Sequence, residues 1–236
     1  MGSDAARLLE AADFAAWKHR EQRRKDPEGT PYINHPIGAR PLPSRCPSRD
    51  PCSEPPVPLP SGQPPYGGAR GAGPRPPPSP PLPVSPVPGV ARILSHEAGV
   101  TDVVVLQAAL LHDTVEDTDT TLPEIEERFG PEVRRVVEEL TDDKTLPKAE
   151  RKRLQVERAA GSSARAKLVK LADKLHNLRD LQRCAPKGWS EERVQEYFRW
   201  AAEVVAGLRG TSPPLEAALQ RLLEERGVAP GPGTGQ

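Results

Sequence analysis

A proline-rich stretch over residues 39–89 interrupts the chain and limits which parts of it can form a core. It holds 19 of the 30 prolines, and its apolar residues follow neither helical nor strand spacing. Such a segment buries too little surface to offset the entropy lost on ordering, so we predict disorder with local polyproline II character. Arg75 to Pro81 has the spacing of an SH3 ligand, but such matches arise easily by chance, and no SH3-type partner is expected.

The residues on either side of this stretch read as two halves of one helix. His35-Pro36-Ile37-Gly38 precedes it and Val90-Ala91-Arg92-Ile93-Leu94 follows it. Joined directly, they would form an amphipathic helix with proline in its first turn. We therefore interpret residues 39–89 as an insertion into a helix, which weakens the placement of His35 and lowers activity. Pro88-Gly89-Val90 partly imitates the original start, so the second half can begin a helix by itself.

Outside the insertion, apolar positions recur at helical spacing, which predicts an all-α fold. We expect one helical domain built from residues 1–38 and 90–228, followed by a flexible tail over 229–236. Residues 144–158 are crowded with basic side chains. The expected helices cover 4–24, 90–97, 102–112, 122–129, 131–141, 163–183, 190–208 and 214–226.

Composition excludes several classes of function. The 33 basic and 33 acidic residues give no net charge, so bulk attraction to nucleic acid is not expected. No apolar run reaches the length of a membrane span, and the N-terminus lacks the layout of a signal peptide. Three cysteines, Cys46, Cys52 and Cys184, are too few and scattered for a disulfide framework. A reducing, cytoplasmic compartment is therefore expected.

A cluster of imidazole and carboxylate groups stands at the polar end of the apolar run 103–110. His112 and Asp113 are adjacent, and Glu116 and Asp117 follow each of them by four residues, one helical turn further on. Burying such charges is costly unless they are paired or bind a cation, so the cluster indicates a divalent metal. The alternative is a solvated acidic helix end, which the helix dipole opposes.

Other polar residues are weaker candidates when taken alone. His35 lies at the start of a helix, where histidine is more often a cap or a packed side chain than a ligand. Asp173 lies opposite the leucine stripe Leu168, Leu171, Leu175 and Leu178, with Asn177 one turn later on the same face. That face reads as exposed unless another element covers it. His19, His96 and His176 are expected to be structural or surface residues.

Together, these residues resemble a known family. The order of His35, His112-Asp113 and Asp173 is similar to the pattern of HD-domain metallophosphohydrolases. The residues around these positions indicate a smaller group within that family. They look like the hydrolase domain of RelA/SpoT proteins in three segments: Tyr-Ile-Asn-His-Pro, Leu-His-Asp-Thr-Val-Glu-Asp and Ala-Asp-Lys-Leu-His-Asn-Leu-Arg. In its length and in these segments, the chain is most similar to the stand-alone animal members of the RelA/SpoT family. The resemblance covers 1–38 and 90 to about 228.

This resemblance implies a helical bundle that binds one Mn²⁺ through His35, His112, Asp113 and Asp173. It also implies that the pair Glu116 and Asp117 handles the attacking water. The family removes pyrophosphate from the 3′ position of guanosine alarmones, such as guanosine 3′,5′-bis(diphosphate), and its animal branch also acts on the 2′-phosphate of NADPH. Side chains expected to contact the nucleotide are Arg24, Lys25, Lys148, Asn177 and Tyr197.

Two alternatives stay open at this point. Another nucleotide phosphohydrolase of the same superfamily would share the metal ligands but not the flanking sequence. A pseudoenzyme or proline-rich scaffold is the second alternative, because only three residues separate His35 from the insertion.

Overall fold

The computed structural model describes residues 2–23, 32, 35 and 89–229, and every helix or strand element in these ranges is helical. The predicted all-α fold is therefore confirmed. Nearly all of the predicted insertion over 39–89 lies outside the described residues, and so do Arg24 and Lys25. Gly89, the last residue of the predicted insertion, is described.

The helix α4 (Val103–Leu111) is the first of two central elements of the described fold. The side chain of Asp102 caps it by accepting a hydrogen bond from the Val104 N–H at 2.9 Å. Nearly all of its residues are apolar and buried, which is typical of a helix surrounded by other helices. It packs against α1 (Asp4–Lys18), α7 (Pro131–Leu140) and α9 (Ala164–Arg183).

The long helix α9 is the second central element. Ser163 caps its start by accepting from the Ala166 N–H at 3.2 Å. Leu171, Leu175 and Leu178 are fully buried, which confirms the predicted stripe, whereas Leu168 is only partly buried. The helices α10 (Glu191–Ala206) and α11 (Pro213–Glu225) pack against α9. Because α9 also contacts α4 and α7, it joins the N-terminal and C-terminal helices into one core.

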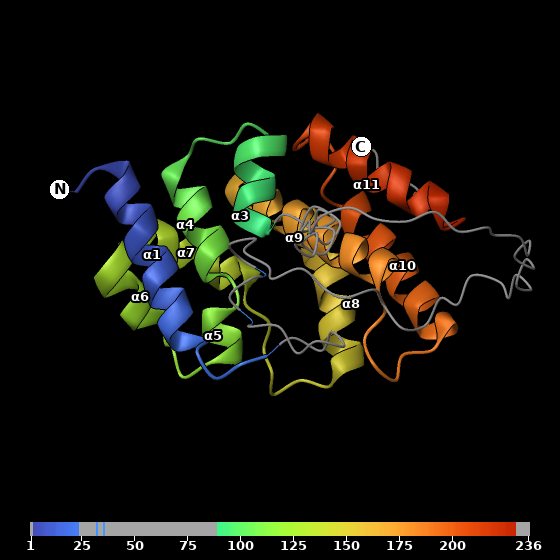
Figure 1. The fold of residues 1–236 in the computed structure, drawn as a ribbon, viewed down its shortest axis with the longest axis horizontal. Helices are drawn as coiled ribbons and strands as arrows, with labels where there is room; N and C mark the ends of the chain where they lie inside the picture. Colours follow the sequence, from blue (N-terminus) through green and yellow to red (C-terminus); the bar gives the residue numbers. More distant parts are fainter. Residues whose placement is uncertain (1, 24–31, 33–34, 36–88, 230–236) are drawn as a thin grey trace, which may run out of the picture. The chain divides into compact units, whose positions relative to one another are not determined.

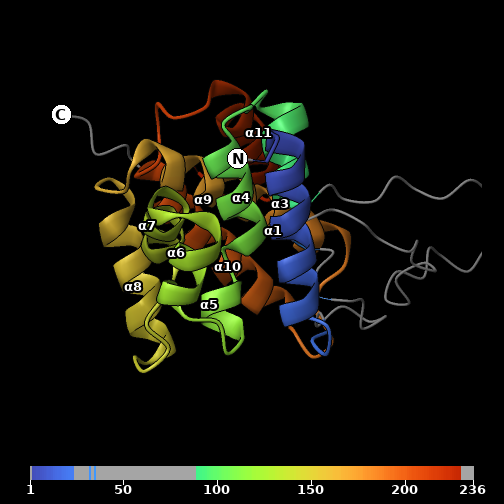
Figure 2. The ribbon, with the colours of Figure 1, turned by 90° about the vertical axis from the view of Figure 1, so that its left-hand side faces the viewer.

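The helix α1 lies alongside α4 in both ribbon views (Figure 1, Figure 2). It ends at Lys18 rather than at residue 24, and Leu9 is 71% exposed. The buried face is centred instead on Ala11 and Phe14, because the Phe14 ring packs edge-on against Phe129 with centroids 5.4 Å apart. Phe129 closes α6 (Leu122–Phe129).

The helix α8 (Lys148–Ala159) was not predicted. Its sequence is rich in charge, and Ala159 is its one buried residue, so it has almost no apolar stripe. It is held through α10: the Trp200 indole N–H donates to the Lys152 carbonyl at 3.1 Å, and Gly207 lies directly against Ala159. Partner contacts thus define this helix more than its own pattern does.

The chain after the predicted insertion begins a helix of its own. Gly89 is the N-cap of α3 (Val90–Arg92), and the Ile93 N–H donates to the Gly89 carbonyl at 2.8 Å. The helix continues as a π-helical turn, η1 (Ile93–Glu97). Val90, Ile93 and Leu94 are fully buried, so core packing fixes this start. The expectation that the second half can begin without His35 in the same helix is confirmed.

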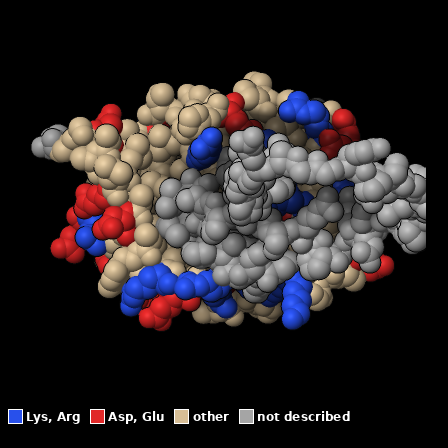
Figure 3. Space-filling view, in the orientation of Figure 1, with Lys and Arg blue, Asp and Glu red and all other residues tan. Residues whose placement is uncertain are grey.

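Surface and sequence features bear on the expected compartment and partners. Within the described part of the chain, no helix is both long and apolar enough for a bilayer span. On the face shown in Figure 3, acidic and basic side chains are mixed around the edge rather than joined into a basic stripe. The cytoplasmic location stays a prediction.

Candidate functional site

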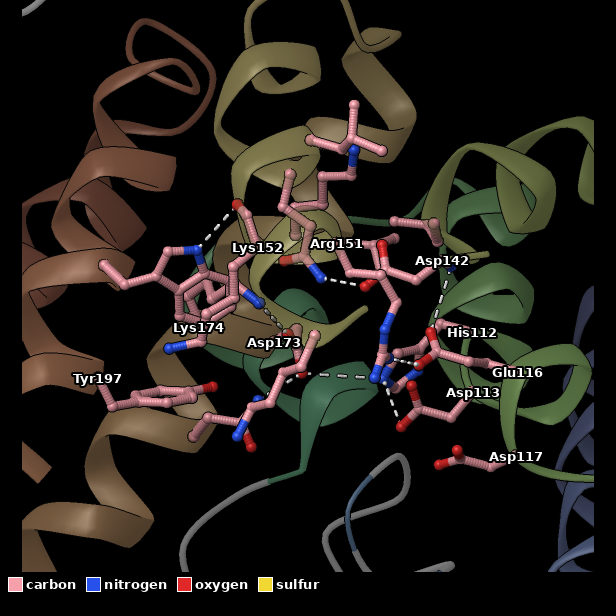
Figure 4. Close-up of a pocket in the computed structure, with 18 of the residues that line it drawn as sticks. His112, Asp113, Glu116, Asp117, Asp142, Arg151, Lys152, Asp173, Lys174 and Tyr197 are labelled. Atoms are coloured by element: carbon pink, nitrogen blue, oxygen red, sulfur yellow. Dashed lines mark hydrogen bonds and ion pairs between the residues drawn. The ribbon is translucent and has the colours of Figure 1, made fainter. Parts of the chain in front are cut away.

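The four predicted metal ligands converge although they come from three distant parts of the sequence. His35 Nε2 lies 3.2 Å from His112 Nε2, 3.5 Å from Asp113 Oδ2 and 3.2 Å from Asp173 Oδ1. His112 Nε2 lies 3.1 Å from Asp113 Oδ2 and 3.8 Å from Asp173 Oδ1. Figure 4 shows Asp173 facing His112 and Asp113 across the cavity.

Hydrogen bonds orient both histidines. His112 Nδ1 lies 2.8 Å from the Ala109 carbonyl oxygen, which can only accept, so Nδ1 carries a proton and Nε2 faces the cluster. His35 Nδ1 lies 2.9 Å from Nδ1 of His176. His176 was expected to be structural or on the surface. It is fully buried and contacts a predicted ligand directly.

The two carboxylates are held by neighbours as well. The Tyr32 hydroxyl donates to Asp113 Oδ2 at 2.7 Å. Lys174 Nζ donates to Asp173 Oδ2 at 3.1 Å, and Asn177 Nδ2 donates to Asp173 Oδ1 at 2.8 Å. Each carboxylate is therefore fixed by side chains outside the cluster, as metal ligands commonly are.

The histidines and carboxylates of the cluster shift each other's pKa values. Burial alone would lower the pKa of His112, but the charges of Asp113 and Asp173 outweigh it and raise the pKa to about 9. Burial opposes ionisation of Asp173, yet Lys174 and the two histidines hold its pKa well below the ordinary value. Buried carboxylates that stay ionised need positive charge close by. A cation and the His112 proton compete for this cluster.

Glu116 and Asp117 lie next to the cluster on α5 (Thr114–Asp117), a short helix between the expected helices 102–112 and 122–129. Glu116 Oε2 accepts from the Asp142 N–H at 3.3 Å, and its Oε1 lies 3.7 Å from Arg151 Nη1. Asp117 accepts from Lys144 Nζ. Burial, followed by the charge of Asp113, raises the pKa of Glu116 to about 7.

The cluster forms one end of a cavity of about 440 Å³ bounded by α5, α8, α9 and α10. The end near α4 and α5 is acidic, and the end between α8 and α10 is basic and aromatic. Lys152 Nζ lies 4.6 Å from the centre of the Trp200 ring, and Lys174 Nζ lies at the same distance. Burial and the nearby Lys148 lower the pKa of Lys152. Cations gathered at one end suit a ligand with several negative charges.

The structure places the predicted nucleotide contacts unevenly. Lys148, Asn177 and Tyr197 line the cavity, while Arg24 and Lys25 lie outside the described residues. Sequence reasoning missed further lining residues on α8, α9 and α10. On α8 the signal was present, since Lys148, Arg151, Lys152 and Gln155 recur at helical spacing on one face. The missed residues include Arg151, Lys152, Lys174, Arg193 and Trp200, together with Trp189 in the loop before α10.

Comparison with known proteins agrees with the geometry of the site. A family profile described as HD domain matches residues 83–202. Guanosine-3′,5′-bis(diphosphate) 3′-pyrophosphohydrolase MESH1 of Mus musculus and that of Homo sapiens are each 60% identical over 228 residues, covering 97% of this chain and 99% of the relative. The Drosophila melanogaster protein of that name is 45% identical over 224 residues, covering 95% of this chain and 97% of the relative.

A solved structure is also similar. It belongs to a protein described as a metazoan ortholog of SpoT that hydrolyses ppGpp. The TM-score is 0.72 at 45% sequence identity, and the match covers 95% of this chain and 97% of that one. The fold, the convergent His and Asp residues and this near full-length similarity agree. The chain therefore belongs to the HD-domain family and, within it, to the guanosine-3′,5′-bis(diphosphate) 3′-pyrophosphohydrolases that include the MESH1 proteins.

Proposed function

We propose that this chain hydrolyses guanosine 3′,5′-bis(diphosphate) to GDP and pyrophosphate with the help of Mn²⁺. The observation that carries the proposal is the convergence of His35, His112, Asp113 and Asp173 at the acidic end of a cavity whose other end is basic and aromatic. The near full-length relatives that are named for this activity support it.

The residues present fit a divalent cation. Nε2 of His35 and His112 and an oxygen of Asp113 all lie within 4.8 Å of one another, and Asp173 Oδ1 faces both histidines. Two imidazoles and two carboxylates suit Mn²⁺ or an ion of similar hardness. When bound, the metal supplies Lewis-acid polarisation and positive charge for a phosphate group.

Glu116 is the side chain we assign to accept the proton of the attacking water. Its pKa of about 7 places it close to neutral pH, where a general base is most effective. The water oxygen bonds to the phosphorus next to the 3′ oxygen, and the bond between that phosphorus and the 3′ oxygen breaks. The proton ends on the 3′ hydroxyl of GDP. Asp117, held by Lys144, is assigned to orienting the water.

The opposite end of the cavity accounts for the rest of the nucleotide. Trp189, Tyr197 and Trp200 offer ring faces on which a base can stack, and Arg193 lies 4.2 Å above the Trp189 ring. Lys148 and Lys152 supply charge for phosphate oxygens. This division of the cavity suits a substrate with an aromatic base and separate phosphate groups.

The test compares Asp173→Ala with the unchanged chain and with the control Asp119→Ala, an exposed aspartate paired with Lys18. Asp173→Ala is expected to lose bound Mn²⁺, measured by elemental analysis, and to lose at least 100-fold in turnover. Asp119→Ala should retain both. Full Mn²⁺ content and full activity in Asp173→Ala would refute the metal assignment.

The substrate is tested with guanosine 3′,5′-bis(diphosphate), NADPH and simple nucleoside triphosphates assayed side by side with Mn²⁺. Preferential release of pyrophosphate from the first supports the proposal. Preference for NADPH or for a simple nucleotide would support the other phosphohydrolase activities instead. Metal binding without turnover of any of them would favour the pseudoenzyme alternative.

A further inference from the structure

Arg151 reaches from α8 toward Glu116 at the acidic end of the cavity (Figure 4). Its side chain is only 25% exposed. It lies on the face of α8 that also carries Lys148 and Lys152, both of which line the cavity. Arg151 is thus an arginine placed beside the group we assign as the proton acceptor.

The guanidinium of Arg151 has donors left over. Among the described residues, the carboxylate beside it is that of Glu116, whose Oε1 lies 3.7 Å from Nη1, too far for a hydrogen bond. Nε is buried and has no hydrogen-bond partner among the described residues. A buried N–H without an acceptor is costly, so a ligand that supplies acceptor oxygens would relieve that cost.

Two of the neighbouring cations are already paired with carboxylates. Lys174 is hydrogen-bonded to Asp173, and Lys144 is hydrogen-bonded to Asp117. Arg151 differs from both, because its planar fork remains open toward the cavity. The raised pKa of Glu116 agrees with this, since an arginine firmly bound to that carboxylate would lower its pKa.

A guanidinium with free donors matches the chemistry of the reaction. During hydrolysis, negative charge builds up on the oxygens of the phosphorus that leaves the 3′ oxygen. Arginine binds two such oxygens at once through parallel N–H bonds, which lysine cannot do. A donor fixed where charge develops accelerates the step without moving.

We propose that Arg151 is a catalytic residue that binds the departing diphosphate group of the substrate. The proposal rests on the proposed function, because it concerns the same reaction. The bond changes are those already given: one water is added, the bond from phosphorus to the 3′ oxygen breaks, and pyrophosphate is released. Arg151 exchanges no proton and balances charge on the phosphate oxygens.

The experiment uses the full-length, Mn²⁺-loaded chain and the variants Arg151→Gln and Arg151→Lys. The control is Arg153→Gln, which changes an exposed arginine of the same helix that pairs with Glu150 and Glu157. Arg151→Gln is expected to lower kcat by roughly 100-fold or more with little change in KM. Arg151→Lys should recover only part of that loss, because it retains the charge without the fork.

Two further measurements distinguish direct contact of Arg151 with the substrate from an indirect effect of Arg151 on Glu116. Inorganic pyrophosphate should bind Arg151→Gln at least tenfold more weakly than the unchanged chain, measured by calorimetry with Mn²⁺ present. Arg151→Gln should also lower the residual kcat of Glu116→Gln at least tenfold. A thermal midpoint within a few degrees of the unchanged chain checks that Arg151→Gln is folded, and Arg151→Lys takes its place if it is not.

Three outcomes would overturn the proposal for Arg151: a kcat in Arg151→Gln equal to that of Arg153→Gln, unaltered pyrophosphate binding, or a double variant no slower than Glu116→Gln alone. Failure of the proposed function looks different. In that case the unchanged chain does not hydrolyse guanosine 3′,5′-bis(diphosphate), while the pyrophosphate calorimetry still reports on Arg151.

Discussion

Glu116 is held in surroundings that oppose its negative charge. It is largely buried, and Asp113, Asp117 and Asp142 lie near enough to repel it, which raises its pKa to about 7 from an ordinary value of 4.5. The unfolded chain has no such repulsion. Folding is therefore less favourable when Glu116 is ionised, and the structure retains this side chain at a cost in stability.

We predict that Glu116→Gln stabilises the metal-depleted protein at pH 8 by about 1–3 kcal/mol, although it lowers activity. The direction follows from the raised pKa. Below pH 4.5 Glu116 is protonated in both states and costs nothing, and between pH 4.5 and 7 stability falls as the folded state resists ionisation. Glutamine does not ionise, so the substitution removes this pH-dependent contribution to the free energy of unfolding.

The measurement is urea unfolding of the chelator-treated protein at pH 5 and pH 8. The difference between Glu116→Gln and the unchanged chain should be larger at pH 8. Glu127→Gln, on the outer face of α6, serves as a control for losing one carboxylate. Equal differences at the two pH values would contradict the assignment of a raised pKa to Glu116.

Residue patterns predicted the centre of the site better than its surroundings. His112 and Asp113 stood out because acidic and imidazole groups ended an apolar helix, and that signal is local. Asp173 by itself read as exposed, because nothing in its own helix shows that α8 and α10 lie across the cavity from it. His176 was missed for the same reason, since its partner His35 lies far away in sequence. Lys174 is bonded to the adjacent Asp173, but its place beside the Trp200 ring depends on α10.

At the scale of helices, the contact between α8 and α10 places the basic end of the cavity. A Cβ atom at Gly207, directly after α10, would lie 2.7 Å from Ala159 Cβ and 3.1 Å from Ala160 N. The end of α8 and the end of α10 can approach this closely only because Gly207 has no side chain. Its backbone is in the ordinary right-handed region, so the requirement is for space.

We predict that Gly207→Ala destabilises the protein by about 1–3 kcal/mol through overpacking. The thermal midpoint should fall by roughly 3 to 10 °C, and turnover should fall with it because α8 carries Arg151 and Lys152. Gly161→Ala is the matched control, since its new Cβ would meet only the Arg158 carbonyl oxygen at 3.9 Å. Similar midpoints for the two variants would show that the contact can relax.

Most helices could be predicted because caps and apolar spacing agree. Ser163, Ser190 and Asp102 each cap the helix that the apolar pattern predicts. The helix α8 was missed because it lacks an apolar stripe and depends on α10 for its place. The end of α1 was set too late because its charged continuation retains helical propensity, whereas the structure turns at His19.

At the scale of the whole molecule, the predicted insertion separates His35 from the residues that hold the other three ligands. His35 nevertheless lies within 3.5 Å of His112, Asp113 and Asp173, so these four residues meet in this chain. The disorder predicted for residues 39–89 concerns residues that the structure does not describe. What the insertion changes is the entropy of bringing His35 to the site.

We predict that deleting residues 39–89 strengthens Mn²⁺ binding and raises activity. Shortening the connection reduces the loop-closure entropy by on the order of 2 kcal/mol, which corresponds to roughly thirtyfold in affinity. Mn²⁺ titration by calorimetry and turnover of both chains provide the measurement. Equal affinity and activity would contradict the expected damage by the insertion.

The independent start of α3 at Gly89 has a consequence for how the enzyme is assembled. The N-terminal piece is fastened to the core by α1, where Arg7 and Gln107 hydrogen-bond to each other, and it contributes His35. The piece that begins at Gly89 caps its own first helix and contributes the other three ligands. Neither the hydrogen bonds of Arg7 with Gln107 nor the cap of α3 requires that the two pieces be joined covalently. The protein thus has the layout of a two-fragment enzyme, in which a single cut between the fragments leaves every ligand attached to a packed helical scaffold.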